Sequence, residues 1–143
     1  MKRIALALAS TLALAALIPA AQAVEYTQVQ PEKSAVNFVY KQMGVAVDGK
    51  FKKFSSTLSF DPAKPTAAKA SFDVQLGSVD TGAPEGDDEV AGKAWFNTKA
   101  FPTASFVSGT VKALGGNKYE VAGQLSIKGK TQDVVVPATF TAQ

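Results

Sequence analysis

The 143-residue chain contains no cysteine and no histidine. Without cysteine it can form no disulfide, no thiolate nucleophile and no thiolate metal site. Without histidine it lacks the most common general base and the most common metal ligand. Ser-His-Asp and Cys-His enzymes are therefore excluded, as are zinc sites built on imidazole. Any chemistry would have to use carboxylates or lysines, within a length that suits one domain.

The acidic residues do not form an evident catalytic or metal site. The densest group is Glu85 with residues 87–89, and its spacing does not match the alternating ligands of an EF-hand loop. We interpret this group as the solvated start of a short helix rather than a Ca²⁺ site. The other carboxylates are scattered over separate turns and strand faces, which disfavours the paired carboxylates of a glycosidase.

The N-terminus has the three parts of a secretory signal peptide. Lys2 and Arg3 precede an apolar run at residues 4–18, and Ala21-Gln22-Ala23 offers a small-x-small cleavage site. The apolar run is shorter than the roughly 20 residues of a spanning helix. We predict cleavage after Ala23, export, and no integral membrane segment in the mature protein at residues 24–143.

Charge in the mature chain is nearly balanced. Loss of Lys2 and Arg3 leaves 13 lysines against 12 acidic residues. A nucleic-acid-binding protein needs several basic side chains gathered on one surface. No such stripe is present, so we expect no nucleic-acid partner.

Alternating apolar and polar residues predict β-strands. The pattern is clear at residues 34–41, 70–76 and 118–128. Such alternation is typical of antiparallel sheets with one buried face. Turn sequences at residues 115–117 and 128–130 predict tight hairpins, whereas Asp48-Gly49 is either a turn or a bulge inside one long strand. The sequence therefore favours an all-β barrel or sandwich.

Residues 84–96 lack this alternation. We predict one or two helical turns there, with Asp87 or Asp88 as the N-cap. Lys50 and Lys52 are expected on one strand face, either as a basic rim for an anionic head group or as edge-strand lysines that discourage aggregation. The inward aromatic residues leave two alternatives open, a filled core or a cavity for one small ligand.

An ordered series of short motifs resembles the YceI family of exported bacterial lipocalin-like proteins. The series is SAVNF at 34–38, QMG at 42–44, GKF at 49–51, LSFDP at 58–62, SVDTG at 78–82, WFN at 95–97, FPTASF at 101–106, VAGQLSIKG at 121–129 and VVVP at 134–137. The resemblance covers residues 25–142. It implies an antiparallel β-barrel that is periplasmic and non-enzymatic, needs no cofactor, and holds a polyisoprenoid or other long-chain lipid.

The sequence departs from the family pattern at several positions. Gln42 and Lys128 occupy places where many members have histidine, and residues 86–90 lack the family's arginine and histidine. Contacts from those side chains to a ligand head group therefore cannot be transferred. The family also continues for two strands beyond VVVP, so we expect a C-terminally truncated barrel that is open on that side.

Inward positions supply the candidate ligand-binding residues. The expected cavity lining is Val36, Phe38, Tyr40, Val45, Val47, Phe72, Val74, Phe106, Tyr119, Val121 and Leu125, with Trp95, Phe96 and Phe101 closing one end and Lys50 and Lys52 as the possible rim. The alternative function is a structural or stress-related interaction protein with a solid core and no ligand.

Overall fold

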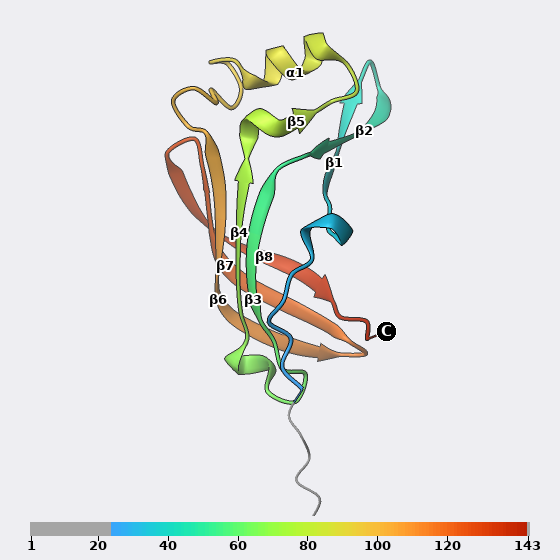
Figure 1. Cartoon of the computed structure of the whole chain (residues 1–143), viewed down its shortest axis with the longest axis vertical. Helices are drawn as coiled ribbons and strands as arrows, with labels where there is room; N and C mark the ends of the chain where they lie inside the picture. The colour runs from blue at the N-terminus through green and yellow to red at the C-terminus, as the bar shows by residue number, and fades with distance from the viewer. Residues whose placement is uncertain (1–23, 143) are drawn as a thin grey trace, which may run out of the picture.

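The computed structural model describes residues 24–142, which form two antiparallel sheets and one α-helix (Figure 1). The predicted signal peptide lies outside the described residues. The smaller sheet has the order β1-β2-β5, comprising β1 (Val36–Gln42), β2 (Val45–Phe51) and β5 (Val79–Asp80). The larger has the order β3-β4-β6-β7-β8, comprising β3 (Phe54–Ser59), β4 (Lys69–Gln75), β6 (Thr103–Gly115), β7 (Lys118–Ile127) and β8 (Lys130–Thr139). Helix α1 (Pro84–Ala91) and three short 3₁₀ turns (Pro31–Lys33, Pro65–Ala67, Leu76–Ser78) complete the structure.

The two predicted hairpins between the long strands are confirmed. Gly116 and Asn117 join β6 to β7 with φ angles of 60° and 63°, and Lys128 and Gly129 join β7 to β8 with 52° and 74°. Two central residues with positive φ match the right-handed twist of the flanking strands. These turns set the register of the three longest strands.

The first hairpin turns earlier than Asp48-Gly49. Its turn lies at Met43 and Gly44, with φ angles of 50° and 81°, and β2 runs uninterrupted through Gly49. Asp48-Gly49 forms neither the turn nor the bulge that the sequence offered as alternatives, because β1 and β2 pair residue for residue, from Val36 with Phe51 to Gln42 with Val45. Gly49 lies opposite Phe38, and a side chain at Gly49 would collide with the Phe38 ring. The glycine is therefore explained by close packing of an aromatic ring.

The predicted cap of α1 is wrong. The N-cap residue is Ala83, without a side-chain cap, and Pro84 occupies the first turn. Asp87 instead accepts hydrogen bonds from the backbone N–H of Thr81 at 2.6 Å and from Thr81 Oγ1 at 2.7 Å. These bonds lower the pKa of Asp87, with a smaller contribution from the charge of Lys52. Asp87 thus fixes the loop between β5 and the helix.

The barrel is open, as predicted. In residues 24–142, β8 pairs only with β7, and β1 pairs only with β2. The N-terminal segment reaches the larger sheet through one bridge, in which Tyr26 and Phe60 exchange backbone hydrogen bonds of 2.7 and 2.9 Å. Figure 1 shows the larger sheet curving beside this segment, with the last strand, in red, at its edge.

Candidate functional site: an apolar groove in the open barrel

The concave face of the larger sheet holds a groove of ≈ 450 Å³. Its lining is almost wholly apolar and comes from β3, β4, β6, β7, β8 and the segments that flank them. The lining residues are Leu58, Phe60, Ala68, Lys69, Ala70, Phe72, Phe106, Val111, Tyr119, Val121, Leu125, Val134, Val136, Ala138, Thr139 and Phe140.

Strand register brings the central lining residues together. Phe72 in β4 lies opposite Phe106 in β6, which lies opposite Leu125 in β7. Opposed residues of an antiparallel pair share a face, so these three side chains form one row across the groove floor. Lys69 is the one charged residue among those that line the groove. It directly precedes Ala70, whose side chain faces the groove, and successive side chains of a strand point to opposite faces. The Lys69 side chain therefore belongs to the outer face of β4.

An aromatic cluster closes one end of the groove. The Phe60 ring lies 5.3 Å from Tyr119 and 5.0 Å from Phe140, and Phe140 lies 5.1 Å from Tyr26, measured between ring centroids. These tilted and edge-on arrangements are favourable for aromatic pairs. The cluster joins the N-terminal segment to the end of β8 through side chains, where no backbone ladder connects them.

A second aromatic cluster lies under the smaller sheet. Phe38 contacts Phe51 at 5.2 Å and Tyr40 at 6.2 Å, and Phe51 contacts Phe96 at 6.1 Å. The Tyr40 hydroxyl donates to the Thr81 carbonyl at 2.6 Å. Of the three aromatic residues expected to close one end of a cavity, Phe96 therefore packs against β2.

The structure distributes the sequence-predicted lining over three places. Phe72, Phe106, Tyr119, Val121 and Leu125 line the groove. Five others are half-buried and do not line it, namely Val36, Phe38, Tyr40 and Val47 on the smaller sheet and Val74 on β4.

Three predicted residues have other surroundings. Val45 is 64% exposed, because it follows the hairpin turn at the free end of β2. Trp95 is 56% exposed in the loop after α1. Phe101 packs against the turn at Gly129, where a side chain would come within 2.9 Å of its ring. These three residues do not contribute to the groove.

Several residues that line the groove are not among those predicted from the sequence. They are Leu58, Phe60, Ala68, Ala70, Val111, Val134, Val136, Ala138 and Phe140. The alternation of residues 134, 136, 138 and 140 was an available signal. The place of Val111 was harder to predict, because a register shift between Ser108 and Thr110 changes which residues of β6 face inward.

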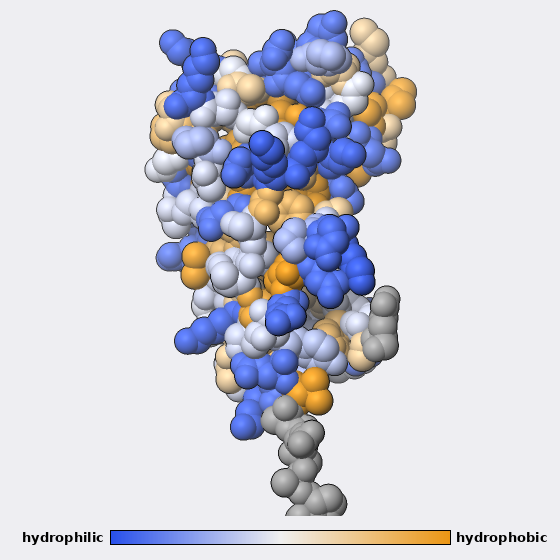
Figure 2. Space-filling view, in the orientation of Figure 1, coloured by the Kyte–Doolittle hydropathy of each residue, from blue (hydrophilic) through white to orange (hydrophobic). Residues whose placement is uncertain are grey.

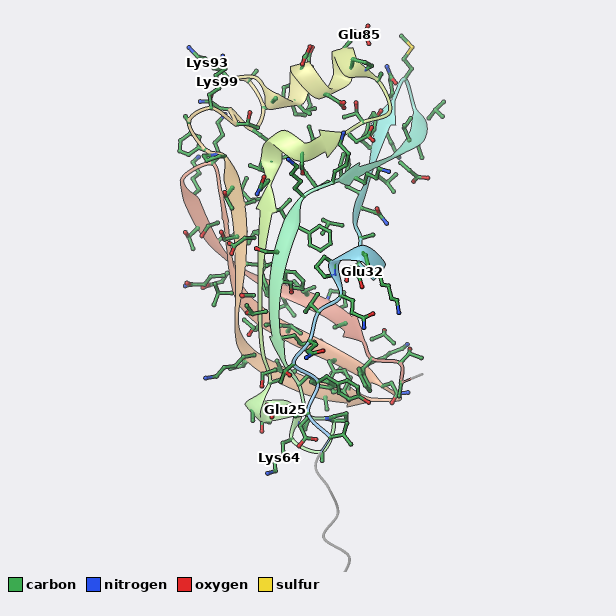
Figure 3. All side chains as sticks on the ribbon, in the orientation of Figure 1. Glu25, Glu32, Lys64, Glu85, Lys93 and Lys99 are labelled. Carbon is green, nitrogen blue, oxygen red and sulfur yellow. The ribbon has the colours of Figure 1, made fainter. Side chains whose placement is uncertain are left out.

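The two rim lysines lie away from the groove. Lys50 is exposed and opposes Asp80 of β5, and Lys52 is exposed beside Lys53, Gln75 and Ser78 at a separate polar hollow. Figure 2 shows polar side chains over most of the visible face, with apolar surface between them in the middle of the molecule. Charged residues labelled in Figure 3 lie at the ends and periphery and do not converge.

Two further features of residues 24–142 bear on the chemistry. No group of three or more acidic side chains is placed to hold a metal ion. No helix in this part of the chain combines the length and apolar character needed to cross a bilayer.

The fold and groove define an open, lipocalin-like antiparallel β-barrel with an apolar interior. The family model described as YceI-like domain matches residues 27–143, so the chain belongs to that family. A UPF0312 protein of Azotobacter vinelandii is 34% identical over 132 residues, covering 90% of this chain and 69% of its own length.

Solved structures share the fold. BcnA of Burkholderia cenocepacia is 46% identical with a TM-score of 0.79, over 81% of this chain and 73% of BcnA. A YceI protein of Campylobacter jejuni is 26% identical with a TM-score of 0.63, over 78% and 66% of the two chains. A domain of Saccharophagus degradans, described as polyisoprenoid-binding, is 19% identical with a TM-score of 0.53, over 72% and 60%, and shows likeness of fold alone.

Proposed function

We propose that the protein binds the hydrocarbon chain of a long lipid, such as a polyisoprenoid, in the groove on the larger sheet. The observation that carries the proposal is a ≈ 450 Å³ space whose lining is almost entirely apolar. Its size falls in the range of small-molecule sites. Each methylene removed from water would contribute about 0.8 kcal/mol. Binding would thus consist of burial, without bond making.

The exposure of the lining favours a ligand over a solid core. Phe72 is 41% exposed and Val136 is 40% exposed, although both line the groove. A filled core would bury side chains in these positions. A bound chain would cover them, which makes the structural-protein alternative the less favoured one.

The head group of such a lipid would remain outside the groove. No charged side chain points into the lining to neutralise it, and burial of an unpaired charge is costly. Lys50 and Lys52 become candidates for head-group contact only if the ligand extends from the groove to the smaller sheet. Native mass spectrometry of neutral and phosphorylated polyprenols with Lys52→Glu and wild type would test this contact.

The direct test is extraction of the purified protein with organic solvent, followed by mass spectrometry of the lipid fraction. Val136→Trp would fill the groove from β8 without introducing a charge, and Val107→Trp, on the outer face of β6, is the matched control. We expect wild type and Val107→Trp to retain lipid and Val136→Trp to lose most of it. Wild-type protein without extractable lipid, and unable to take up added polyprenol, would favour the solid-core alternative.

We also propose that the protein acts in the periplasm after removal of residues 1–23. The n-region, apolar run and Ala21-Gln22-Ala23 support export, and the family resemblance supports the periplasm. N-terminal sequencing of the fractionated protein should begin at Val24. Protein retained in the membrane with its apolar run intact would contradict this placement.

A further inference from the structure

Two segments cross side by side between the larger and the smaller sheet. Lys52 and Lys53 connect β2 to β3, and the 3₁₀ turn Leu76–Ser78 connects β4 to β5 (Figure 1). The Ser78 hydroxyl accepts the Lys53 N–H at 2.9 Å and donates to the Gln75 carbonyl at 2.7 Å. The Ser78 carbonyl accepts the Lys52 N–H at 3.0 Å. Because Ser78 is buried, these bonds fix the backbone that carries both lysines.

A polar hollow of ≈ 860 Å³ lies at these crossings. Gln75 of β4 and Thr103 of β6 line it from paired positions of the two strands. Gln75 is three positions from Phe72, which lines the groove, so the Gln75 side chain belongs to the opposite face of the sheet. The hollow is therefore separate from the groove, and any ligand would enter it from the outer face.

The lining of this hollow carries only positive charge. Lys52 and Lys53 both contribute to it, whereas no aspartate or glutamate of residues 24–142 does. Asp87 is close enough to Lys52 for their charges to interact, but it lies outside the lining. Asp73 lines an adjoining hollow of ≈ 570 Å³ that shares both lysines, where its carboxylate accepts the Ser105 hydroxyl at 2.7 Å. An anion is therefore favoured in the first hollow and disfavoured beside Asp73.

Gly77 keeps the wall of the hollow open. A Cβ at Gly77 would meet no described atom within 4 Å, and the φ of this glycine lies outside the left-handed region. Neither a close contact nor a left-handed backbone therefore accounts for a glycine in this turn. Because Gly77 lines the hollow, a longer side chain there would take up space that is open to a ligand.

We propose that this hollow binds the phosphate group of a small, polar phosphate ester, such as a sugar phosphate. Residues 24–143 contain no arginine, so the planar, bidentate recognition that suits a carboxylate is not available. Two lysines instead act as point charges, and they match the charge of about −1.5 to −2 that a phosphate ester carries at pH 7. The hollow has room beyond the phosphate, where the Gln75 amide and the Thr103 hydroxyl can hydrogen-bond ligand hydroxyls. The proposal goes beyond lipid binding and does not depend on what the groove holds.

Isothermal titration calorimetry of glucose 6-phosphate into lipid-extracted protein tests the site. We expect glucose 6-phosphate to bind, inorganic phosphate to bind more weakly and glucose not to bind, with affinity falling as salt is added. Absence of saturable glucose 6-phosphate binding, or equal binding of glucose, would overturn the proposal. Equal binding of inorganic phosphate would refute the role of Gln75 and Thr103. Binding to phosphatidylglycerol vesicles without binding to the soluble ester would show that the phosphate recognised is that of a lipid head group, and would also overturn the proposal.

Three variants place the binding in this hollow. Lys53→Gln should raise the dissociation constant about tenfold, whereas Lys112→Gln, which removes the same charge near the other end of β6, should change it little. Gly77→Leu should weaken binding about tenfold at constant charge by filling the hollow, with an unchanged thermal melt. Asp73→Asn should strengthen binding, because it removes a negative charge beside the lysines. Equal affinities for wild type, Lys53→Gln and Gly77→Leu would refute the site even where the ester binds elsewhere.

Discussion

Gly123 in β7 provides a sharp test of how the groove floor is packed. It lies opposite Ser108, and a Cβ built on it would meet the carbonyl oxygen of Val107 and come within 2.7 Å of the Phe106 ring. Gly123→Ala therefore forces a shift of β6 backbone as well as of a buried ring. Overpacking of this kind costs about 1–3 kcal/mol.

Gly109 supplies a matched control on the neighbouring strand. A Cβ at Gly109 would meet only the Ala122 carbonyl, at an ordinary 3.5 Å, and its φ is not positive. Gly109→Ala should therefore be neutral or stabilising by about 0.4–1 kcal/mol, because alanine reduces the entropy of the unfolded chain. Glycine to alanine is thus expected to lower the free energy of unfolding at Gly123 and to leave it unchanged or raise it at Gly109, although the two positions lie in adjacent strands.

Urea unfolding followed by far-UV circular dichroism measures both variants. The protein should first be freed of lipid, because a ligand bound to the native state adds its own stabilisation. We expect the Gly123→Ala midpoint to fall and the Gly109→Ala midpoint to stay or rise, with similar slopes for the two transitions. Equal stability of the two variants would refute the assigned packing of Phe106 on Gly123.

Three further predictions concern the rest of the molecule. Asp87→Asn should lower stability at neutral pH, and Asp88→Asn, on the exposed side of α1, should change it little. Because the folded-state pKa of Asp87 lies below the ordinary 3.8, its contribution is present above that value and declines as pH falls through the lower folded-state pKa, so thermal melts of wild type and Asp87→Asn should converge in acid. Gly49→Ala should destabilise the smaller sheet through Phe38, visible as faster amide exchange in β1 and β2 than in β7. Val121→Asp should abolish lipid retention, assayed by extraction, while Gln124→Asp on the outer face of the same strand should not.

The strands and hairpins could be predicted because local sequence decides them. Alternation at residues 118–127 and the positive-φ turn at Gly116 and Asn117 each require only neighbouring residues. The cap of α1 could not, because Asp87 makes its hydrogen bonds to Thr81, before the helix. The sequence indicates that an aspartate is favourable near the start of a helix. Only the folded structure shows that the Asp87 carboxylate accepts its hydrogen bonds from Thr81.

The candidate site was partly predictable for a similar reason. Alternation identifies the face of a strand, and Phe72, Phe106 and Val121, which it assigns to inward faces, line the groove. It does not identify which sheet a strand joins. Val36 and Phe38 therefore lie in the smaller sheet, away from the groove. Val45 is exposed at the end of β2 that follows the hairpin turn. The bulge between Ser108 and Thr110 in β6 reverses which alternate residues face the groove, so Val111 joins the lining. The local sequence pattern does not show this reversal.

Each sheet contains an aromatic ring packed over a glycine of the neighbouring strand, and one of these pairs borders the groove. Phe38 lies over Gly49 in one sheet and Phe106 over Gly123 in the other, in each case with the far edge of the ring nearest the missing side chain. The Phe106 ring occupies volume that a side chain at Gly123 would otherwise fill, so it forms part of the groove floor rather than standing across the groove. A larger residue at Gly123 would displace the Phe106 ring toward the groove, whereas one at Gly49 would displace the Phe38 ring beneath the smaller sheet. Gly123 thus sets the depth of the groove beside Phe106, and with it the space open to the proposed apolar ligand.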